Sequence, residues 1–328
     1  MRKHKHTREI VFYAVILILV LVMLYSGLQI LESTVLYHGQ GQEPTVDSKT
    51  ITVDGVQYFP RQDITVVLLM GIDRYGPVED SGFYTNTGAA DVDMLVILDE
   101  TQQKIDLLYL NRDTMLTMPV LGIGGRPAGT YYGQLALAHT YGSGLHDSCE
   151  NTRQAISDLL CGVKIDYYVS LNMDAIAILN DAVGGVTVEV TEDFSAVDSS
   201  ITMGKVTLMG QQAINYVRTR KDVGDQLNLT RIERQKDYIR GFTEALKAKQ
   251  GSNSDFVLSV YEQVAPYMVT DCSATVFHSL VSRYATYEIG RILSPEGENV
   301  MGETYFEFYA DQDSVLQLTL DLFYAPKE

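Results

Sequence analysis

Two aspartates lie at the ends of predicted buried strands. Asp73 closely follows the apolar run ITVVLLM (64–70), and Asp91 directly precedes the run VDMLVILD (92–99). In an open α/β sheet ligands gather at strand ends, and two carboxylates there can hold one Mg²⁺, which takes oxygen ligands and shares them with phosphates. Asp93 is expected on the same side as Asp91, because side chains alternate along a strand. The alternative is that these carboxylates only terminate strands and loops.

Arginines gather in a protein that is otherwise acidic, with 42 acidic and 25 basic residues and a net charge of −17. Arg112 follows a predicted strand, and Arg218 and Arg220 lie where a predicted helix gives way to a loop. Arg231 and Gln235 share a helix face because they are four residues apart. Guanidinium groups form bidentate hydrogen bonds with phosphate oxygens, so these residues with Mg²⁺ suit a diphosphate. The alternative is solvated helix faces that pair arginine with acidic residues.

Other chemistry is poorly supported. A strongly negative charge disfavours binding to nucleic acid. The sequence contains no Gly-x-Ser-x-Gly nucleophile motif, and His139, in LALAHTYG, is interpreted as a structural histidine rather than a catalytic one. The three cysteines, Cys149, Cys161 and Cys272, have no zinc-binding spacing and are predicted to be small buried residues.

An uncharged apolar stretch covers residues 10–31. Its length is enough for a helix to cross a hydrocarbon core about 30 Å thick, and the basic residues before it are expected to stay in the cytoplasm. A cleaved signal peptide is the alternative, but it would have a shorter apolar region. We therefore predict a cytoplasmic tail (1–9), a transmembrane anchor (10–31), a linker (32–48) and an extracytoplasmic domain (49–328).

Strand and helix patterns alternate through this domain. A hairpin is predicted around Asp54-Gly55, and a capping-box pattern at Asp147 and Glu150 predicts the start of a helix. Further strands are predicted at 64–70, 92–99, 104–111, 165–172 and 186–190, and further helices at 174–183, 210–220, 229–249, 256–264 and 315–323. This mixture indicates an α/β domain with a central sheet between helices.

Taken in order, seven segments resemble the LytR-CpsA-Psr (LCP) family. They are VVLLMGID, ADVDMLVIL, LYLNRDTM, ALAHTYG, IDYYVSLNMDAIAILNDAVGGVTVEV, LMGQQAINYVRTRK and LTRIERQ, within residues 64–250. The ordered set is specific, although each segment alone is weak. The resemblance implies a three-layer α/β/α domain with a central mixed sheet, preceded by one transmembrane helix and lying outside a Gram-positive type of cell. An older label for this domain is cell-envelope-related transcriptional attenuator.

The resemblance also implies an activity. Such proteins transfer glycopolymers, for example teichoic acids, from a polyprenyl-diphosphate carrier in the membrane to peptidoglycan, with Mg²⁺ as cofactor. Carried over by position, Asp73 and Asp91 become the metal ligands, and together with Arg112 they become the catalytic residues. The residues implied to bind the substrate diphosphate are Arg218, Arg220, Arg231 and Gln235.

Two positions depart from the family pattern. The family usually has arginine where this chain has Ala89, and lysine where it has Gln134. Arg74 and Arg126 are the candidates to replace these cations. The departures favour one alternative, a non-catalytic protein that binds polyprenyl diphosphate or has a regulatory role. A second alternative is a lipid-diphosphate hydrolase that uses the same metal site with water as acceptor.

Overall fold

The structure is a computed structural model in which part of the chain is described. The described residues are 50–219, 223, 234, 237–238, 240–242, 244–246, 248–249, 256–273, 276, 279–280, 283–284 and 287–327. The predicted tail, anchor and linker lie outside them, and no helix in the described part is long and apolar enough to cross a membrane. The described chain forms two compact units: unit 1 contains Asn172–Met268 and Ser273–Ala285, and unit 2 contains the remainder.

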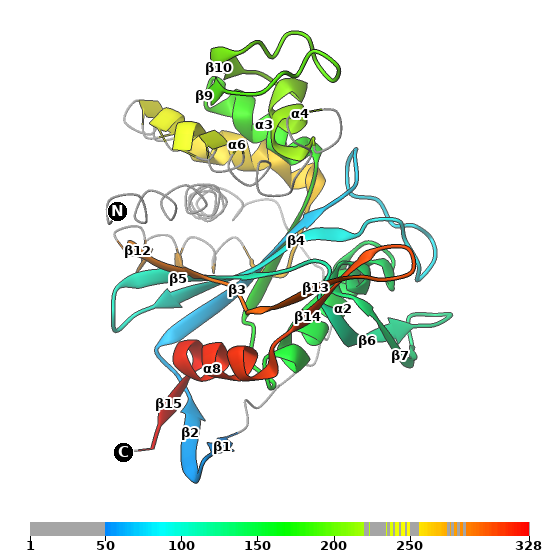
Figure 1. The fold of residues 1–328 in the computed structure, drawn as a ribbon, viewed down its shortest axis with the longest axis vertical. Coiled ribbons are helices and arrows are strands. Elements are labelled where there is room, and N and C mark those ends of the chain that lie inside the picture. Colours follow the sequence, from blue (N-terminus) through cyan, green and yellow to red (C-terminus); the bar gives the residue numbers. More distant parts are fainter. Residues whose placement is uncertain are drawn as a thin grey trace, which may run out of the picture. The chain divides into compact units, whose positions relative to one another are not determined.

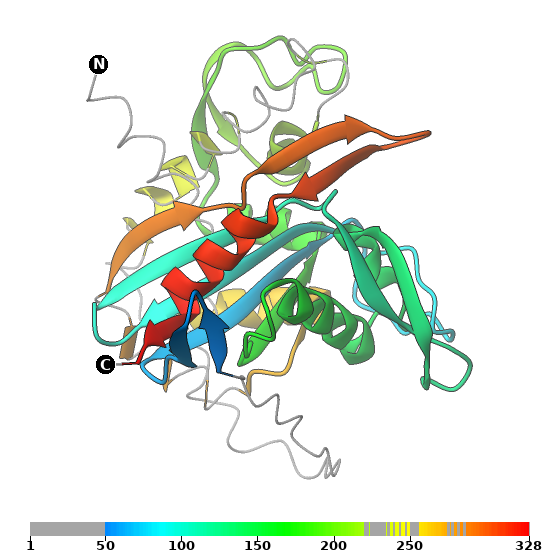
Figure 2. The same cartoon turned by 60° about the horizontal axis from the view of Figure 1, so that its bottom comes forward.

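A mixed sheet forms the centre of unit 2 (Figures 1 and 2). Its strands, in spatial order, are β11 (Met268–Thr270), β8 (Tyr167–Asn172), β3 (Ile64–Ile72), β4 (Ala90–Asp99), β5 (Lys104–Leu110) and β12 (Glu288–Leu293). β4 is antiparallel to β3 and β5, whereas β12 is parallel to β5. The predicted central mixed sheet is confirmed, and the predicted strands differ from the observed ones by two residues or fewer at each end.

Two helices of unit 2, α2 (His146–Leu159) and α8 (Gln312–Phe323), share a hydrophobic core with the sheet. Leu68, Leu95 and Leu108 of the three central strands are fully buried in this core. The alternate side chains of these strands are also buried, which explains why the sequence is continuously apolar there instead of alternating. The core therefore holds the strand ends, where the candidate site lies, on a rigid base.

The capping-box prediction at the start of α2 is wrong. The helix begins at His146, and the Asp147 carboxylate turns back to accept hydrogen bonds from the Ser143 amide (2.8 Å) and hydroxyl (2.5 Å). Glu150 instead forms an ion pair with Arg153. Asp147 lies inside the first turn rather than before it, so its side chain fixes the preceding loop.

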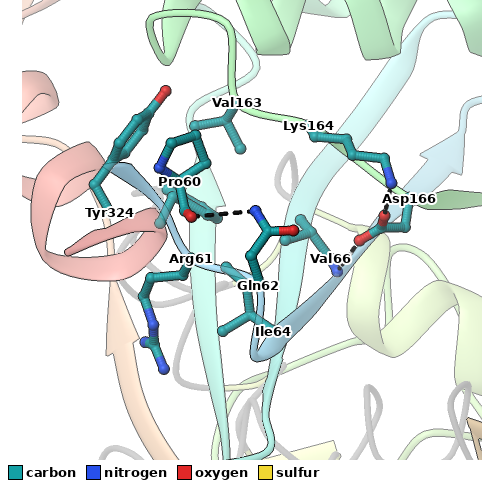
Figure 3. Close-up of a pocket in the computed structure, with 10 residues that line it drawn as sticks. Pro60, Arg61, Gln62, Ile64, Val66, Val163, Lys164, Asp166 and Tyr324 are labelled. Atoms are coloured by element: carbon teal, nitrogen blue, oxygen red, sulfur yellow. Dashed lines mark hydrogen bonds and ion pairs between the residues drawn. The ribbon is translucent and has the colours of Figure 1, made fainter. Parts of the chain in front are cut away.

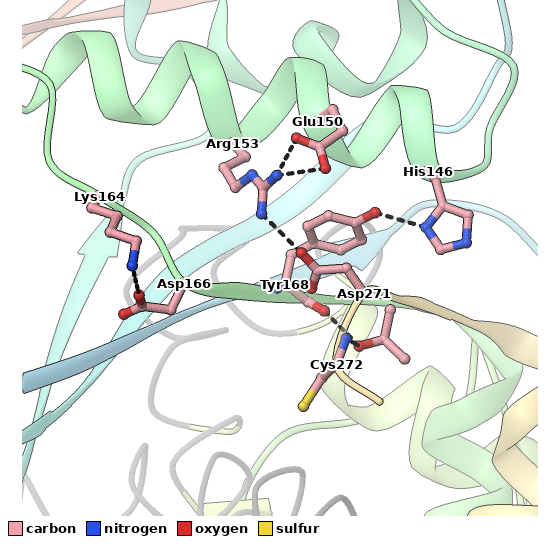
Figure 4. A network of polar contacts seen from close by, with 9 residues as sticks. His146, Glu150, Arg153, Lys164, Asp166, Tyr168, Asp271 and Cys272 are labelled. Atoms are coloured by element: carbon pink, nitrogen blue, oxygen red, sulfur yellow. Dashed lines mark hydrogen bonds and ion pairs between the residues drawn. The ribbon is translucent and has the colours of Figure 1, made fainter. Parts of the chain in front are cut away.

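A polar network attaches the edge strand β11 to α2 (Figure 4). Arg153 lies 2.8 Å from the Asp271 carboxylate and 5.2 Å from the centre of the Tyr168 ring. Asp271 also accepts the Tyr168 amide at 2.8 Å, and the Tyr168 hydroxyl is hydrogen-bonded to His146 Nδ1 at 2.7 Å. Burial raises the pKa of Asp271 above its usual value, although Arg153 opposes that shift. This network fixes the point where the chain returns to unit 1 after β11.

Cys161 shows why one cysteine prediction is wrong. Cys149 and Cys272 are buried as expected, but Cys161 is exposed. It follows the end of α2 with φ of 60°, and its amide and that of Gly162 bond to the carbonyls of Asp158 (3.3 Å) and Ser157 (2.7 Å). This is a Schellman motif, so the position of Cys161 is set by helix termination rather than by a core.

Unit 1 contains α3 (Asp174–Ala182), the hairpin β9 (Val186–Val190) and β10 (Gly204–Leu208), α4 (Gln211–Arg218) and α6 (Phe256–Val264). The predicted end of α3 is confirmed, because Gly184 and Gly185 follow it with φ of 89° and 91°. Much of the predicted helix at 229–249 lies outside the described residues, but those described there are helical.

Three hairpins complete unit 2. β1 (Ile51–Val53) and β2 (Val56–Pro60) form the predicted hairpin around Asp54-Gly55, and β15 (Tyr324–Pro326) extends it. The other two, β6 (Met115–Leu121) with β7 (Pro127–Gln134) and β13 (Gly297–Met301) with β14 (Phe306–Ala310), were not predicted. Most residues of β7 and all residues of β13 are exposed, and β14 buries only Phe308, so these strands have little buried apolar surface that a sequence pattern could reveal.

Candidate active site

A change of register places Asp91 at a β-bulge. Gly71 pairs with Val92, but the next residue of β3, Ile72, pairs with Ala90, so β4 has one extra residue, Asp91. Bulges bend a strand and redirect a side chain, and they are frequent beside active sites. Asp91 therefore lies outside the regular register of β3 with β4.

Asp73 and Asp91 leave the same end of the β3–β4 pair. The Asp73 amide donates to the carbonyl of Ala89, two residues before Asp91, at 2.9 Å. Both aspartates are partly buried. Their common position at a strand end agrees with the prediction, whereas their role as joint metal ligands stays a prediction.

Arg112 and Asp91 are in direct contact. The Arg112 guanidinium donates to the Asp91 carboxylate in an ion pair, and its Nε lies 3.5 Å from Asp113. The Arg112 and Asp91 side chains are 36% and 26% exposed, so the pair is accessible to a ligand. Two residues predicted from chain segments about twenty positions apart thus form one polar centre.

Gln134 connects this centre to β14. Its amide nitrogen donates to the Asp113 carboxylate at 2.9 Å and to the Phe306 carbonyl at 2.8 Å. The family usually has a positively charged lysine at this position. The neutral Gln134 side chain instead binds the β14 backbone. The sequence identified this departure but not its structural partners.

Asp93, which the sequence analysis considered beside Asp91, was not assigned a role in the predicted site. Its side chain is fully buried, and no described residue hydrogen-bonds either carboxylate oxygen. Burial raises the pKa of Asp93 well above its usual value, the charge of Asp91 raises it further, and Arg112 lowers it. An acid within the apolar run VDMLVILD was the available signal.

The oxygen donors at this strand end fit a divalent cation. No three His, Cys, Asp or Glu side chains of the described chain lie close enough together to hold a metal ion by themselves. Mg²⁺ does not require such a group, because it usually keeps several waters and binds through one or two carboxylates and substrate phosphates. Asp91 provides an accessible carboxylate, and Asp93 provides two buried oxygens without a described partner.

The two arginines considered as replacements differ in position, and the Cδ of Arg74 lies 3.6 Å from where a side chain on Gly88, next to Ala89, would begin. The Arg74 Nη1 lies 3.6 Å from where a side chain on Gly144 would begin, so it reaches toward the loop before α2. Arg126 is exposed in the β6–β7 turn, eight residues from Gln134. At ~3.3 Å per residue along a strand, that separation is roughly 26 Å, so Arg126 does not occupy the place of the expected lysine.

The interpretation of His139 as a structural residue agrees with its surroundings. It is buried, and its Nδ1–H donates to the carbonyl of Gly88 at 2.7 Å. Burial, the largest effect, lowers the pKa of His139 from 6.5 to about 4. His139 is therefore neutral at pH 7 and holds the loop that leads into β4.

Replacing His139 with asparagine is expected to make the unfolding free energy fall less steeply as the pH is lowered from 7 to 4. The folded-state pKa lies below the unfolded value, so folding becomes less favourable as the pH falls from 6.5 toward 4. The natural protein should lose about 3 kcal/mol of unfolding free energy through this one group by pH 4. Urea unfolding of both proteins should be measured between pH 7 and pH 4. The difference between the two profiles gives the contribution of His139, because the carboxylates are common to both proteins. Parallel pH profiles would contradict a neutral buried His139.

The predicted diphosphate ligands belong to a different part of the chain. Arg218 is the last residue of α4 in unit 1, and its side chain is exposed. Arg220, Arg231 and Gln235 lie outside the described residues. Their role therefore stays a prediction from the resemblance.

Arg234 has a structural role within the basic stretch. It is buried, its Nε lies 2.7 Å from Glu192, and its Cζ lies 5.1 Å from the centre of the Phe194 ring. Its other nitrogens donate to the carbonyls of Tyr216, at 3.2 Å, and Thr219. These carbonyls end α4, where cations are favourable. Arg234 thus supports the segment that begins with Arg218, a role that no sequence pattern indicated.

A pocket of about 260 Å³ lies at the opposite end of β3 (Figure 3). Its wall includes Val66, seven residues and thus roughly 23 Å along the strand from Asp73. Its cations already have partners, because Arg61 pairs with Asp63 and Asp99, and Lys164 pairs with Asp166. We therefore do not place the chemistry in this pocket.

The mixed α/β fold and the carboxylate–arginine pair at its strand end define the class of protein. Residues 31–322 match the LytR_cpsA_psr family, and the chain belongs to that family. Among its relatives is a protein of Oceanobacillus iheyensis named polyisoprenyl-teichoic acid–peptidoglycan teichoic acid transferase TagU. The two are 25% identical over 323 residues, which is 93% of this chain and 91% of the relative. The TagU of Enterococcus faecalis is 30% identical over 63% of this chain and 61% of its own length.

Solved structures support the same fold. A protein of Streptococcus agalactiae, gbs0355, aligns with a TM-score of 0.61 and 21% identity over 79% of this chain and 86% of its own. A structure described as TagT bound to LI-WTA aligns with a TM-score of 0.54 and 20% identity, over 80% of this chain and 90% of that one. At these identities the likeness concerns the fold alone.

Proposed function

We propose that this chain is a membrane-anchored phosphotransferase that attaches a glycopolymer from a polyprenyl-diphosphate carrier to peptidoglycan. The observation that carries the proposal is the accessible ion pair of Arg112 with Asp91 at the bulged end of β4. The name of the O. iheyensis relative supports a teichoic acid as the polymer and peptidoglycan as the acceptor. Residues 10–31 would anchor the chain beside its lipid substrate, with the large domain outside the cell.

The proposed reaction is a phosphoryl transfer to a sugar hydroxyl. The acceptor oxygen forms a bond to the phosphorus attached to the glycan, the bond from that phosphorus to polyprenyl phosphate breaks, and the hydroxyl proton passes to a carboxylate. Asp91 and Asp73 are the candidate bases. Phosphoryl transfer depends mostly on positioning and charge stabilisation. Arg112 can supply both, because its planar guanidinium is held by Asp91 and also lies close to Asp113.

The proposed cofactor is Mg²⁺, with Asp73 and Asp91 as its ligands. When bound, it would neutralise charge on the diphosphate oxygens. The proposed diphosphate ligands are Arg218, Arg220, Arg231 and Gln235. The arginines suit this role because a planar guanidinium can form two hydrogen bonds with phosphate oxygens. Together these assignments give every charged residue that the family resemblance singled out a role.

A second function is favoured by one specific observation. Gln134 is engaged with Asp113 and Phe306 where the family usually has lysine, and Ala89 stands where it usually has arginine. A centre with fewer cations would still bind a ground-state diphosphate but would stabilise the transition state less. A lipid-binding or regulatory protein with slow turnover is therefore the alternative to an efficient transferase.

Replacing Ala89 with arginine is expected to raise turnover more than lipid affinity. Only interactions that are stronger in the transition state accelerate the chemical step, and the Nη1 of Arg74 lies 3.6 Å from where a side chain on Gly144 would begin. We expect a gain of at least about tenfold in the transfer rate, with the ~10²–10³-fold effect of one charge-stabilising group as its upper range. Transfer rate and lipid affinity should be measured for both proteins. An unchanged rate would mean that other residues already supply this charge.

Binding of the carrier lipid tests the proposal at its first step. The full chain, purified in mild detergent, should retain or take up a polyprenyl-diphosphate lipid that native mass spectrometry detects. Arg112→Ala serves as the comparison, because it removes the guanidinium that Asp91 holds. If the natural chain binds no lipid diphosphate under any condition, both the transferase and its regulatory alternative are wrong.

A further inference from the structure

Asp93 occupies a position where a carboxylate is costly. In the sheet it pairs with Met70 of β3 and Leu110 of β5, both of which are buried. Asp93 itself has no exposed surface, and no described residue donates a hydrogen bond to Oδ1 or Oδ2. An ionised carboxylate that leaves water without a partner loses its solvation and gains nothing in return.

The charged neighbours do not solve this problem. Asp91, two residues earlier, is itself an acid, and Arg112 is already bound to Asp91 and close to Asp113. These positions thus hold three carboxylates, Asp91, Asp93 and Asp113, and one guanidinium. Gln134, at the place of an expected lysine, adds no charge. Among these described residues carboxylates outnumber guanidinium groups by two, a difference that one bound divalent cation would balance.

We propose that Asp93 is a metal-binding residue, and that with Asp91 it holds a divalent cation even before the diphosphate arrives. Asp91 would bind the ion from its accessible side and Asp93 from the core side. The remaining positions would be filled by water, and later by phosphate oxygens, which agrees with the preference of Mg²⁺ for few protein ligands. The inference rests on the cation proposed for transfer, but it does not depend on the polymer or the acceptor.

The experiment measures cation binding without any lipid. Mn²⁺ serves as the probe because electron paramagnetic resonance distinguishes free from bound ion, and Mg²⁺ is then titrated in competition. The full chain in detergent is compared with Asp93→Asn, which keeps the shape but removes the charge. Glu298→Gln, on the exposed strand β13, is the control for a lost surface carboxylate.

We expect Asp93→Asn to weaken Mn²⁺ binding at least tenfold and Glu298→Gln to leave it unchanged. Without the ion, Asp93→Asn should unfold at the same temperature as the natural chain or higher, because a buried carboxylate without a partner has been removed. With saturating ion, the natural chain should gain more thermal stability than the variant. A variant that is at least as stable as the natural chain without the ion, but gains less stability from the ion, would not result from a simple loss of packing.

Other outcomes overturn the proposal. If Asp93→Asn binds Mn²⁺ normally, Asp93 is a buried neutral acid of the core. If it fails to fold, Asp91→Asn is the second variant, and normal Mn²⁺ binding by that protein contradicts a shared site. If the natural chain binds no Mn²⁺ without lipid, the preformed site is wrong. The proposed transferase function is then judged separately, by lipid binding and transfer.

Discussion

Asp91→Asn is expected to lower glycan transfer by about 10²–10³-fold, the usual loss when one charge-stabilising group leaves a reacting centre. The substitution removes a predicted metal ligand and the carboxylate that holds the Arg112 guanidinium. Because Asp91 is a partly exposed residue at a bulge, the substitution opens no core cavity. The transfer rate should be measured with a lipid-linked glycan donor and a peptidoglycan acceptor, alongside thermal unfolding.

Two comparisons make this result interpretable. Glu298→Gln should transfer at the natural rate, since it removes an exposed acid from β13. Asp73→Asn should lose activity as Asp91→Asn does if both hold the ion. Near-natural activity of Asp91→Asn would mean that this residue takes no part in the proposed chemistry. An unfolded Asp91→Asn protein would mean that the Asp91 carboxylate is needed for the fold.

Arg234→Met is expected to destabilise the fold by about 3–5 kcal/mol, the range for breaking a buried ion pair from one side. The substitution leaves Glu192 buried without its cation and removes the donors to the carbonyls of Tyr216 and Thr219. The double variant Arg234→Met/Glu192→Leu should recover part of the loss, because no buried charge remains. Urea unfolding measures the free energies.

Neighbouring arginines give the matched comparison. Arg231→Lys keeps the charge but loses the planar fork, and should weaken binding of the lipid diphosphate by about 1–3 kcal/mol with normal stability. Arg240→Lys should change neither, since Arg240 is exposed and pairs with Asp237 at 3.4 Å. If Arg234→Met remains stable but loses lipid binding, Arg234 is a ligand and not a support.

The central strands and their acidic ends were predictable from the sequence. Largely apolar runs flanked by turn residues specify β3, β4 and β5, because burial on both faces leaves few polar positions. Asp73 and Asp91 were found because they interrupt that pattern at strand ends. Arg112 could be placed for the same reason, and its contact with Asp91 follows from the antiparallel pairing of β4 with β5.

Other parts of the site depend on information that no local pattern holds. The bulge at Asp91 arises from the register of two strands, so the alternation argument could not give the direction of its side chain. One partner of Gln134, the Phe306 carbonyl, comes from β14, 172 residues away in the sequence. Arg234 is of the same type as the predicted diphosphate ligand Arg231 and lies three residues from it, and no sequence pattern indicated the buried pair of Arg234 with Glu192.

Analysis of the reaction products tests the central claim most directly. The full chain in detergent is incubated with Mg²⁺, a radiolabelled glycan on polyprenyl diphosphate, and peptidoglycan, and the insoluble wall is washed and digested. The account predicts label attached covalently to wall fragments through a phosphodiester, with an equal amount of polyprenyl phosphate released. Soluble phosphorylated glycan without wall attachment would identify a hydrolase, and bound but unreacted lipid would identify a binding protein. Either result contradicts the phosphotransferase.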